Sequence, residues 1–165
     1  MRQAFFLLCA VFATELHPVQ AQPAIRVEPP DPAYTGTLQS QTADAVIRNY
    51  LHAWDSLRAA FAQNRTTSLD QDFVGTAKEK LAATIRQQAA LGFGTEYHDR
   101  AHNIKIVFAS PEGLSVELED DVDYEVQLLG SNKPTSKLNR KARYFVVLTP
   151  TETRWRVRVF QAEHD

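Results

Sequence analysis

Cysteine is almost absent from this chain of 165 residues, in which Cys9 is the only example. Cys9 lies in an N-terminal segment that we expect to be removed from the mature protein. A mature chain without cysteine has no disulfide bond, no thiol nucleophile and no cysteine-ligated metal ion. Its stability must come from the burial of apolar side chains, and a chain of roughly 140 residues can bury about two-thirds of its unfolded surface.

Several motifs that signal a particular chemistry are also missing. The sequence has no GxGxxG or GxxxxGK[ST] loop for nucleotide phosphates, no GxSxG for an acyl-transfer serine and no HExxH for zinc. We therefore predict that the protein uses no cofactor and no metal ion. Its formal net charge of -2 at pH 7 gives no reason to expect nucleic acid or an anionic membrane as a partner.

No apolar run is long enough to cross a bilayer, which takes about 20 residues in a helix. A short run from Ala4 to Ala13 follows Arg2, and a polar stretch then ends in Val19-Gln20-Ala21. These features indicate a cleavable signal peptide over residues 1–21, with an uncleaved N-terminal anchor as the alternative. We predict an exported protein of bacterial type, periplasmic or secreted, without a permanent membrane anchor.

Two helical stretches follow the signal peptide. Residues 22–41 are rich in proline and predict a disordered leader or linker. From Thr42, which can cap a helix, apolar residues recur every three or four positions and predict an amphipathic helix to about Asn64. Ser68 opens a second helical stretch with a capping box, and Gly75 is expected to split it. The apolar stripe of the first helix consists of Val46, Tyr50, Trp54, Leu57 and Phe61.

Beyond Gly94 the apolar period falls to two, which is typical of strands. We predict four strands, at residues 96–109, 114–129, 138–149 and 154–162. Their short connections favour antiparallel pairing. The sequence therefore predicts one α+β domain over residues 42–162, with N-terminal helices packed in the concave face of a curved four-stranded sheet.

This order of elements resembles the nuclear transport factor 2-like superfamily, which includes SnoaL-like and ketosteroid isomerase-like proteins. The resemblance rests on the segments AVIRNYLHAWDSL, DFVGTAKEKLAATIRQQAALGFG and RWRVRVFQ. The middle segment is similar to exported or membrane-anchored members of no known activity and to the intermembrane-space-type domain of chloroplast division proteins. The resemblance implies a cone-shaped sheet around the first helix, often with a pocket inside and dimer contacts on the outer face. It implies no reaction, since one fold hosts many functions.

Asp120 is the most informative polar residue. Alternation places it on the same apolar face as Leu118 and Val122, where a carboxylate would be desolvated and available as a general base or neutral donor. The resemblance implies a tyrosine beside such an acid, a place that Tyr50 fits, but a separate base carboxylate has no counterpart. The alternative is a β-bulge within Glu119–Asp121 that turns Asp120 to solvent. We favour the bulge because ionised carboxylates are rarely buried unpaired.

Aromatic residues and histidines supply further candidates. His98 and His102 lie four apart in a predicted strand, which separates their Cα atoms by about 13 Å, too far for one metal ion. We interpret both as part of a solvated or half-solvated strand end. Four aromatic residues are candidates for lining a ligand cavity, although such residues mostly form plain core. They are Tyr50, Trp54, Tyr124 and Tyr144.

Charge is unevenly distributed over the predicted sheet. The outer side of the second strand is acidic, and the later strands are basic. Opposite charges on neighbouring strands stabilise a sheet by about 0.2–1 kcal/mol per pair, and we favour this interpretation. The alternative is a homodimer through the outer sheet face, in which acidic rows meet the basic rows of a second copy. The residues are Glu117, Glu119, Asp121, Asp123 and Glu125, then Lys137, Arg140, Lys141, Arg143, Arg154, Arg156 and Arg158.

Two functional hypotheses follow. The first is a non-enzymatic exported domain that binds a small apolar ligand or assembles with an envelope protein. The second is a cofactor-free isomerase, hydratase or lyase, in which Asp120 and Tyr50 act on a small apolar substrate. An Asp120 carboxyl group that faces Tyr50 beside a cavity of about 300 Å³ or more favours the enzyme, whereas an outward carboxyl group favours the binding domain.

Overall fold

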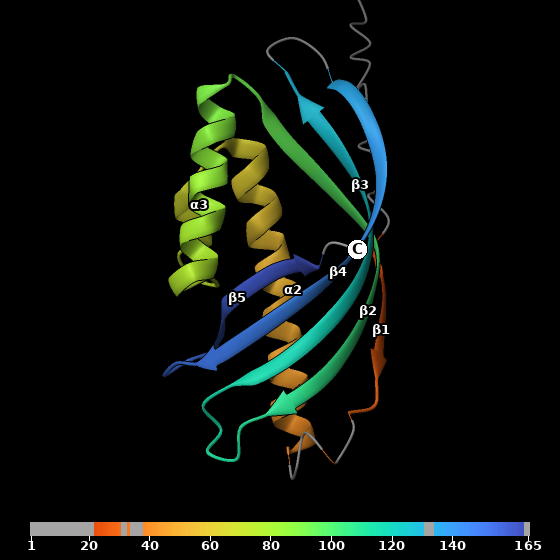
Figure 1. Ribbon diagram of the computed structural model, residues 1–165, viewed down its shortest axis with the longest axis vertical. Helices are drawn as coiled ribbons and strands as arrows, with labels where there is room; N and C mark the ends of the chain where they lie inside the picture. The colour runs from red at the N-terminus through yellow and green to blue at the C-terminus, as the bar shows by residue number, and fades with distance from the viewer. Residues whose placement is uncertain (1–21, 31–32, 34–37, 131–133, 164–165) are drawn as a thin grey trace, which may run out of the picture.

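The computed structural model describes residues 22–30, 33, 38–130 and 134–163, and the predicted signal peptide lies outside these ranges. Its elements are β1 (Ala24–Glu28), α2 (Ser40–Gln63), the 3-10 helix η1 (Thr66–Leu69), α3 (Gly75–Ala90), β2 (Gly94–Ala109), β3 (Val116–Leu129), β4 (Pro134–Pro150) and β5 (Trp155–Glu163). One curved sheet, in the order β1-β2-β3-β4-β5, packs against the helices (Figure 1). Within the described ranges, no helix has the length and apolar composition that crossing a bilayer requires.

The prediction of an α+β fold with helices against a curved sheet is confirmed, but the expected number of strands was wrong. The sheet has five strands, because Ala24–Glu28 pairs in parallel with Ala101–Lys105 of β2. This strand lies in the stretch that we expected to be a disordered leader. Its apolar side chains are largely exposed, with Ile25 42% and Val27 46% accessible, so no buried face produced a strand pattern.

Helix α2 runs through the centre of the fold because its apolar stripe meets the sheet. The expected capping by Thr42 was wrong, since the helix begins two residues earlier at Ser40. The backbone N–H groups of Thr42 and Ala43 instead donate to the carbonyl oxygen of Gln39. Burial of one large apolar side chain stabilises a fold by about 1.5–3 kcal/mol, so this stripe anchors the helix. Its buried residues are Val46, Tyr50, Ala53, Trp54, Leu57, Ala60 and Phe61.

The second helical stretch is divided as predicted, into the short helix η1 and the longer helix α3. Ser68 lies within η1 rather than at its start, and Gly75 begins α3 with a φ of 53°. Glycine adopts this left-handed conformation without a steric penalty, so it marks the boundary between the two helices. Near the end of α3, Gln88 donates to the carbonyl oxygen of Phe61 and accepts from the Thr95 hydroxyl, which joins α3 to α2 and β2.

The register of the sheet decides where Asp120 points. Pairing of β3 with β4 continues without a shift through Glu119, Asp120 and Asp121, which lie opposite Phe145, Tyr144 and Arg143. The bulge that we favoured at this point was therefore wrong. The shifts lie elsewhere, and the one that matters for the site is between Asp99 and Ala101 of β2.

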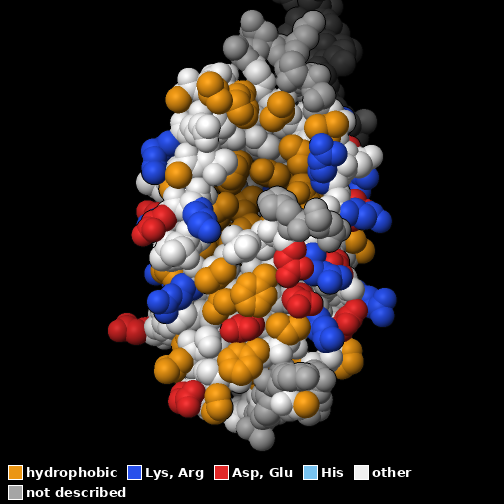
Figure 2. All heavy atoms as spheres, viewed as in Figure 1, with side chains coloured by type: hydrophobic (Ala, Val, Ile, Leu, Met, Phe, Trp, Pro, Cys, Tyr) orange, Lys and Arg blue, Asp and Glu red, His pale blue; other side chains and the backbone are white. Residues whose placement is uncertain are grey.

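The outer face of the sheet carries ion pairs between neighbouring strands (Figure 2, red and blue side chains at the right). Arg143 donates to both carboxyl oxygens of Asp121 at 2.8 and 3.1 Å, which raises the pKa of Arg143. Glu125 contacts Lys137 at 2.9 Å and Arg100 at 3.1 Å, and the hydrogen bond from Lys137 lowers its pKa. The interpretation that these charges pair within one sheet is confirmed, and a homodimer through this face stays a prediction.

Candidate functional site

Asp120 is fully buried, and two side chains from other elements contact it. The Tyr50 hydroxyl of α2 donates to Asp120 Oδ2 at 2.8 Å, and His102 Nδ1 of β2 lies 2.6 Å from the same oxygen. Tyr50 is also fully buried, and His102 is 2% exposed. Alternation therefore predicted the direction of Asp120 correctly. Our objection to a buried carboxylate does not apply here, because this one is paired.

The expectation that His102 belongs to a solvated strand end was wrong, because its side chain is buried. The bulge in β2 adds one residue, so Asp99 and His102 point to the same face although they are three apart in sequence. Both are buried, with Asp99 7% exposed. His98 is partly exposed and contacts Glu96 at 3.5 Å.

Opposite charges alternate through this cluster. Arg58 Nη1 of α2 donates to Asp99 Oδ2 at 2.5 Å, and that oxygen lies 3.6 Å from His102 Nε2. Arg58 also pairs with the exposed Asp55. The Oδ1 atoms of Asp99 and Asp120 are buried and have no hydrogen-bond partner among the residues that the structure describes. Since a buried acceptor without a partner is costly, each of these oxygens is available to a proton or a donor.

The protonation of His102 follows from this arrangement. Burial alone would lower its pKa, but the contacts with Asp120 and Asp99 outweigh that effect and raise the pKa to about 9. His102 is therefore an imidazolium ion at neutral pH and has a proton to donate. Burial, followed by the charge of Asp120, raises the pKa of Tyr50 well above its usual value. Tyr50 thus remains a neutral hydrogen-bond donor to Asp120.

A cavity of about 360 Å³ adjoins this cluster. Asp99, His102 and Arg58 form part of its wall, whereas Asp120 and Tyr50 lie behind His102. The Trp54 ring meets His102 edge to face, with 5.3 Å between ring centroids. The other lining residues are Gln22, Pro23, Ile25, Leu51 and Asp55. The pocket is therefore lined by α2, by β2 and by the residues before and within β1. It is open to one side, and its wall has a charged part and an apolar part.

The four predicted cavity aromatics do not all reach this space. Trp54 lines it, whereas Tyr50 holds Asp120 from behind. Tyr144 packs on Trp54 and Phe160, with ring centroids 5.3 and 4.7 Å apart, and burial raises its pKa. The Tyr124 hydroxyl lies 3.4 Å from that of Tyr144. Tyr124 lines a second, wider depression at the end of β5, and a binding role for these aromatics stays a prediction.

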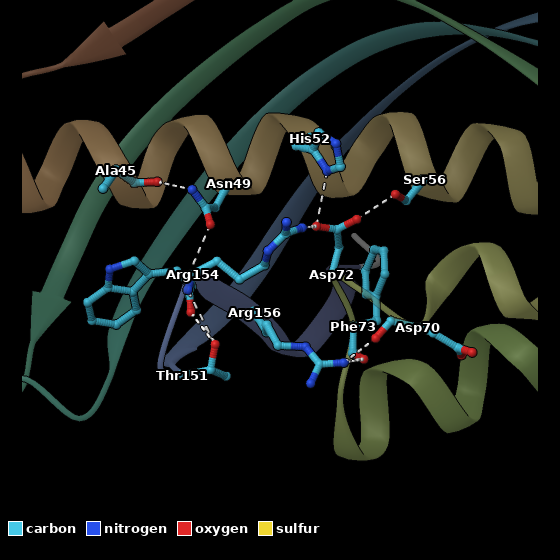
Figure 3. Close-up of polar contacts among 11 residues, drawn as sticks. Ala45, Asn49, His52, Ser56, Asp70, Asp72, Phe73, Thr151, Arg154 and Arg156 are labelled. Atoms are coloured by element: carbon cyan, nitrogen blue, oxygen red, sulfur yellow. Dashed lines mark hydrogen bonds and ion pairs between the residues drawn. The ribbon is translucent and has the colours of Figure 1, made fainter.

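A separate polar cluster surrounds Asp72, which is 1% exposed (Figure 3). Ser56 donates to Asp72 Oδ2 at 2.5 Å, while His52 and Arg154 contact Oδ1 at 3.0 and 3.1 Å. The Val157 N–H of β5 donates to the Asp72 backbone carbonyl at 2.7 Å. These bonds join α2, the segment before α3 and β5, so we interpret the cluster as structural.

The Asp72 cluster leads to a stability prediction. Replacing Asp72 with alanine removes bonds from three side chains, and bonds to a charged group contribute about 1.5–3 kcal/mol each before compensation by water. We expect the free energy of unfolding to fall by about 3 kcal/mol, measured by urea denaturation. The control is His52→Ala, because the His52 side chain is 56% exposed and the expected loss is below about 1 kcal/mol. Equal losses in both variants would contradict the structural role.

Comparison with solved structures identifies the fold. The intermembrane-space region of the chloroplast protein ARC6 matches with a TM-score of 0.64 and 13% sequence identity, covering 78% of this chain and 98% of that chain. A Novosphingobium aromaticivorans protein assigned as a scytalone dehydratase matches with a TM-score of 0.52 and 15% identity, covering 76% of this chain and 89% of that chain. The chain has a nuclear transport factor 2-like fold. At these identities the likeness shows the fold alone, and no family model or curated protein sequence matches.

Within this nuclear transport factor 2-like fold, the sequence indicated Tyr50 and Asp120 as candidates. It gave no indication of Arg58 and Asp99, and we wrongly interpreted His102 as part of a solvated strand end. The sequence shows Asp99 and His102 three residues apart, a spacing that places them on opposite faces of a regular strand. Only the bulge brings them together, and it has no glycine or proline to signal it. In the described part of the chain, no set of three His, Cys, Asp or Glu residues has the geometry of a metal site.

Proposed function

We propose that this domain is a cofactor-free acid–base enzyme, a dehydratase or hydratase acting on a small, largely apolar hydroxy-carbonyl compound. The observation that carries the proposal is a buried His102 held between Asp99 and Asp120 at the wall of a cavity. Buried titratable groups with perturbed pKa values are typical of active sites. The reaction class also agrees with the name of one solved neighbour, which is assigned as a scytalone dehydratase.

The proposed elimination needs an acid and a base on the same side of the substrate. The His102 imidazolium donates a proton from Nε2 to the leaving hydroxyl oxygen, so the C–O bond breaks and water departs. Asp99 accepts the proton from the carbon next to the carbonyl group, and the electron pair of that C–H bond forms the new C=C bond. Because Asp99 Oδ2 lies 3.6 Å from His102 Nε2, the proton can return to His102 and restore the site.

Asp120 and Tyr50 are positioning residues in this proposal. Asp120 holds His102 at Nδ1, which leaves Nε2 as the proton donor, and Tyr50 holds Asp120. The cavity of about 360 Å³ lies at the lower end of the usual range for ligand pockets, about 300–1,000 Å³. Ile25, Leu51 and Trp54 supply an apolar wall, so the substrate is small and carries few polar groups.

The test is proton transfer on a panel of small β-hydroxy ketones. Exchange of the protons next to the carbonyl group in D₂O is followed by proton NMR, and water loss by the absorbance of the conjugated ketone. We expect His102→Gln to lower the rates at least about 100-fold, and Asp99→Asn to lower both exchange and elimination. His98→Gln, in the same strand but outside the cavity, is the control and keeps its rate.

The second candidate is the non-enzymatic exported domain that binds a small apolar ligand or an envelope protein. The better-superposed solved neighbour is described as a region of a chloroplast protein, and its description names no reaction. This candidate is favoured if ligands bind in the cavity unchanged and His102→Gln alters neither exchange nor elimination. Export is tested by mass spectrometry of the protein from cell fractions, in which a processed chain beginning at Gln22 is expected.

A further inference from the structure

Strand β4 is longer than the strand that covers its outer edge. β4 has 17 residues and β5 has nine. Pairing between them ends at Arg143 and Glu163, whereas β4 stays paired with β3 as far as Pro134. Among the described residues, the edge of β4 from Pro134 to Ala142 therefore has no strand beside it. Such an edge carries unpaired N–H and C=O groups that can accept an additional strand.

The surface is hollowed at the point where β5 ends. A depression of about 850 Å³ is lined there by Ala162 and Glu163 of β5 and by residues 140–143 of β4. Ala142 and Ala162 are small, which leaves room in line with the end of β5. In Figure 1 the upper part of β4 curves along the margin of the sheet, beyond the end of β5. An extended chain placed here would continue the line of β5 without displacing a described element.

The charge of this edge indicates the chemistry of its partner. Residues 137–141 are all exposed, and Leu138 among them is 43% accessible. Lys137 and Arg143 are neutralised by Glu125 and Asp121. Lys141 lies opposite Asp123 of β3, which also lines the depression. Arg140 lies opposite Tyr124 and forms no ion pair with any other residue that the structure describes, so it presents the main positive charge beside the open edge.

We propose that the β4 edge over residues 134–142 binds an acidic, extended peptide as an added strand. Backbone hydrogen bonds to β4 would hold the peptide, and its acidic side chains would pair with Arg140 and Lys141. A second copy of this chain fits less well, because two β4 edges related by a two-fold axis would bring the basic residues of both copies into one interface. This surface does not depend on the proposed acid–base reaction.

The test uses a fluorescent, acetylated peptide of about eight residues with the repeat Glu-Glu-Val-Val, which places glutamate on both faces of an added strand of usual length. We expect saturable binding by fluorescence anisotropy that weakens at high salt. The double variant R140E/K141E is expected to bind at least about ten-fold more weakly, which is the loss of about 1.4 kcal/mol. The matched control K80E/R86E changes the net charge equally on the exposed side of α3 and should bind like the wild type.

Two further peptides separate strand addition from charge attraction alone. A peptide methylated at alternate backbone nitrogens keeps its charge but cannot form the ladder, and it should not bind. A lysine–valine peptide should not bind either. The proposal is overturned if the methylated peptide binds as well as the parent, if both double variants weaken binding equally, or if no binding occurs up to about 1 mM. Salt-sensitive self-association that R140E/K141E abolishes would assign the edge to a second copy instead.

Discussion

Replacing Asp120 with asparagine is expected to lower the free energy of unfolding by about 3–5 kcal/mol at neutral pH, the usual cost of removing one partner from a buried ion pair. Asp120 is fully buried, and among the described residues its ion-pair partner is His102, whose Nδ1 lies 2.6 Å from Oδ2. The asparagine has the same shape and can still accept from Tyr50. The variant therefore isolates the charge that keeps His102 protonated.

The matched control for this variant is the next residue in the same strand. Asp121→Asn also removes one negative charge and one ion pair, but both Asp121 and Arg143 are about half exposed. An exposed pair contributes about 0–1 kcal/mol, so the control should unfold almost like the wild type. Urea denaturation at neutral pH measures both variants. Losses that agree within about 1 kcal/mol would show that burial of the Asp120–His102 pair has no special energetic role.

Stability is expected to fall as pH rises from 6.5 through about 9, because the pKa of His102 is raised from 6.5 to about 9 in the folded state. A group whose pKa is raised by folding stabilises the folded state fully at any pH below its pKa in the unfolded chain, where it is protonated in both the folded and the unfolded state. That contribution is lost once the folded protein also releases the proton. The size of the pKa difference corresponds to about 3 kcal/mol.

The measurement for this second prediction is the free energy of unfolding in urea at several pH values between 6 and 10. His102→Gln is the reference, because it lacks the His102 imidazole and keeps every other titrating group of the protein. The wild type should lose about 3 kcal/mol more than this variant across the range. Parallel curves for the two proteins would mean that the imidazole is neutral in the fold, and His102 could then not serve as the proposed acid.

The fold was predictable where one face of an element is buried along its whole length. The apolar stripe of α2 and the alternation in β3 indicated both elements and the direction of Asp120, because these patterns record which side chains meet the core. The sequence of strand β1 shows no such pattern. It lies at the edge of the sheet with its side chains exposed, and only its backbone pairing with β2 makes it a strand.

The site was predictable only in part, because its chemistry depends on contacts between residues far apart in sequence. We favoured a solvent-facing Asp120, because its contacts join residues 18 and 70 positions apart and no local pattern shows them. Only the family resemblance placed Tyr50 beside it. Asp99 faces inward through the register shift in β2. Arg58 then follows from α2 packing beside Asp99, which no property of the helix sequence specifies.

The parallel pairing of β1 with β2 has a consequence for the order of assembly. During synthesis, residues 22–28 are made long before residues 101–105. Strand β1 therefore cannot pair with β2 until most of the domain has been synthesised. Contacts between segments so distant along the chain form slowly, because a long loop must close first. Gln22, Pro23 and Ile25 also line the pocket beside His102. The wall of this pocket is thus completed late in folding, by the first described residues of the chain.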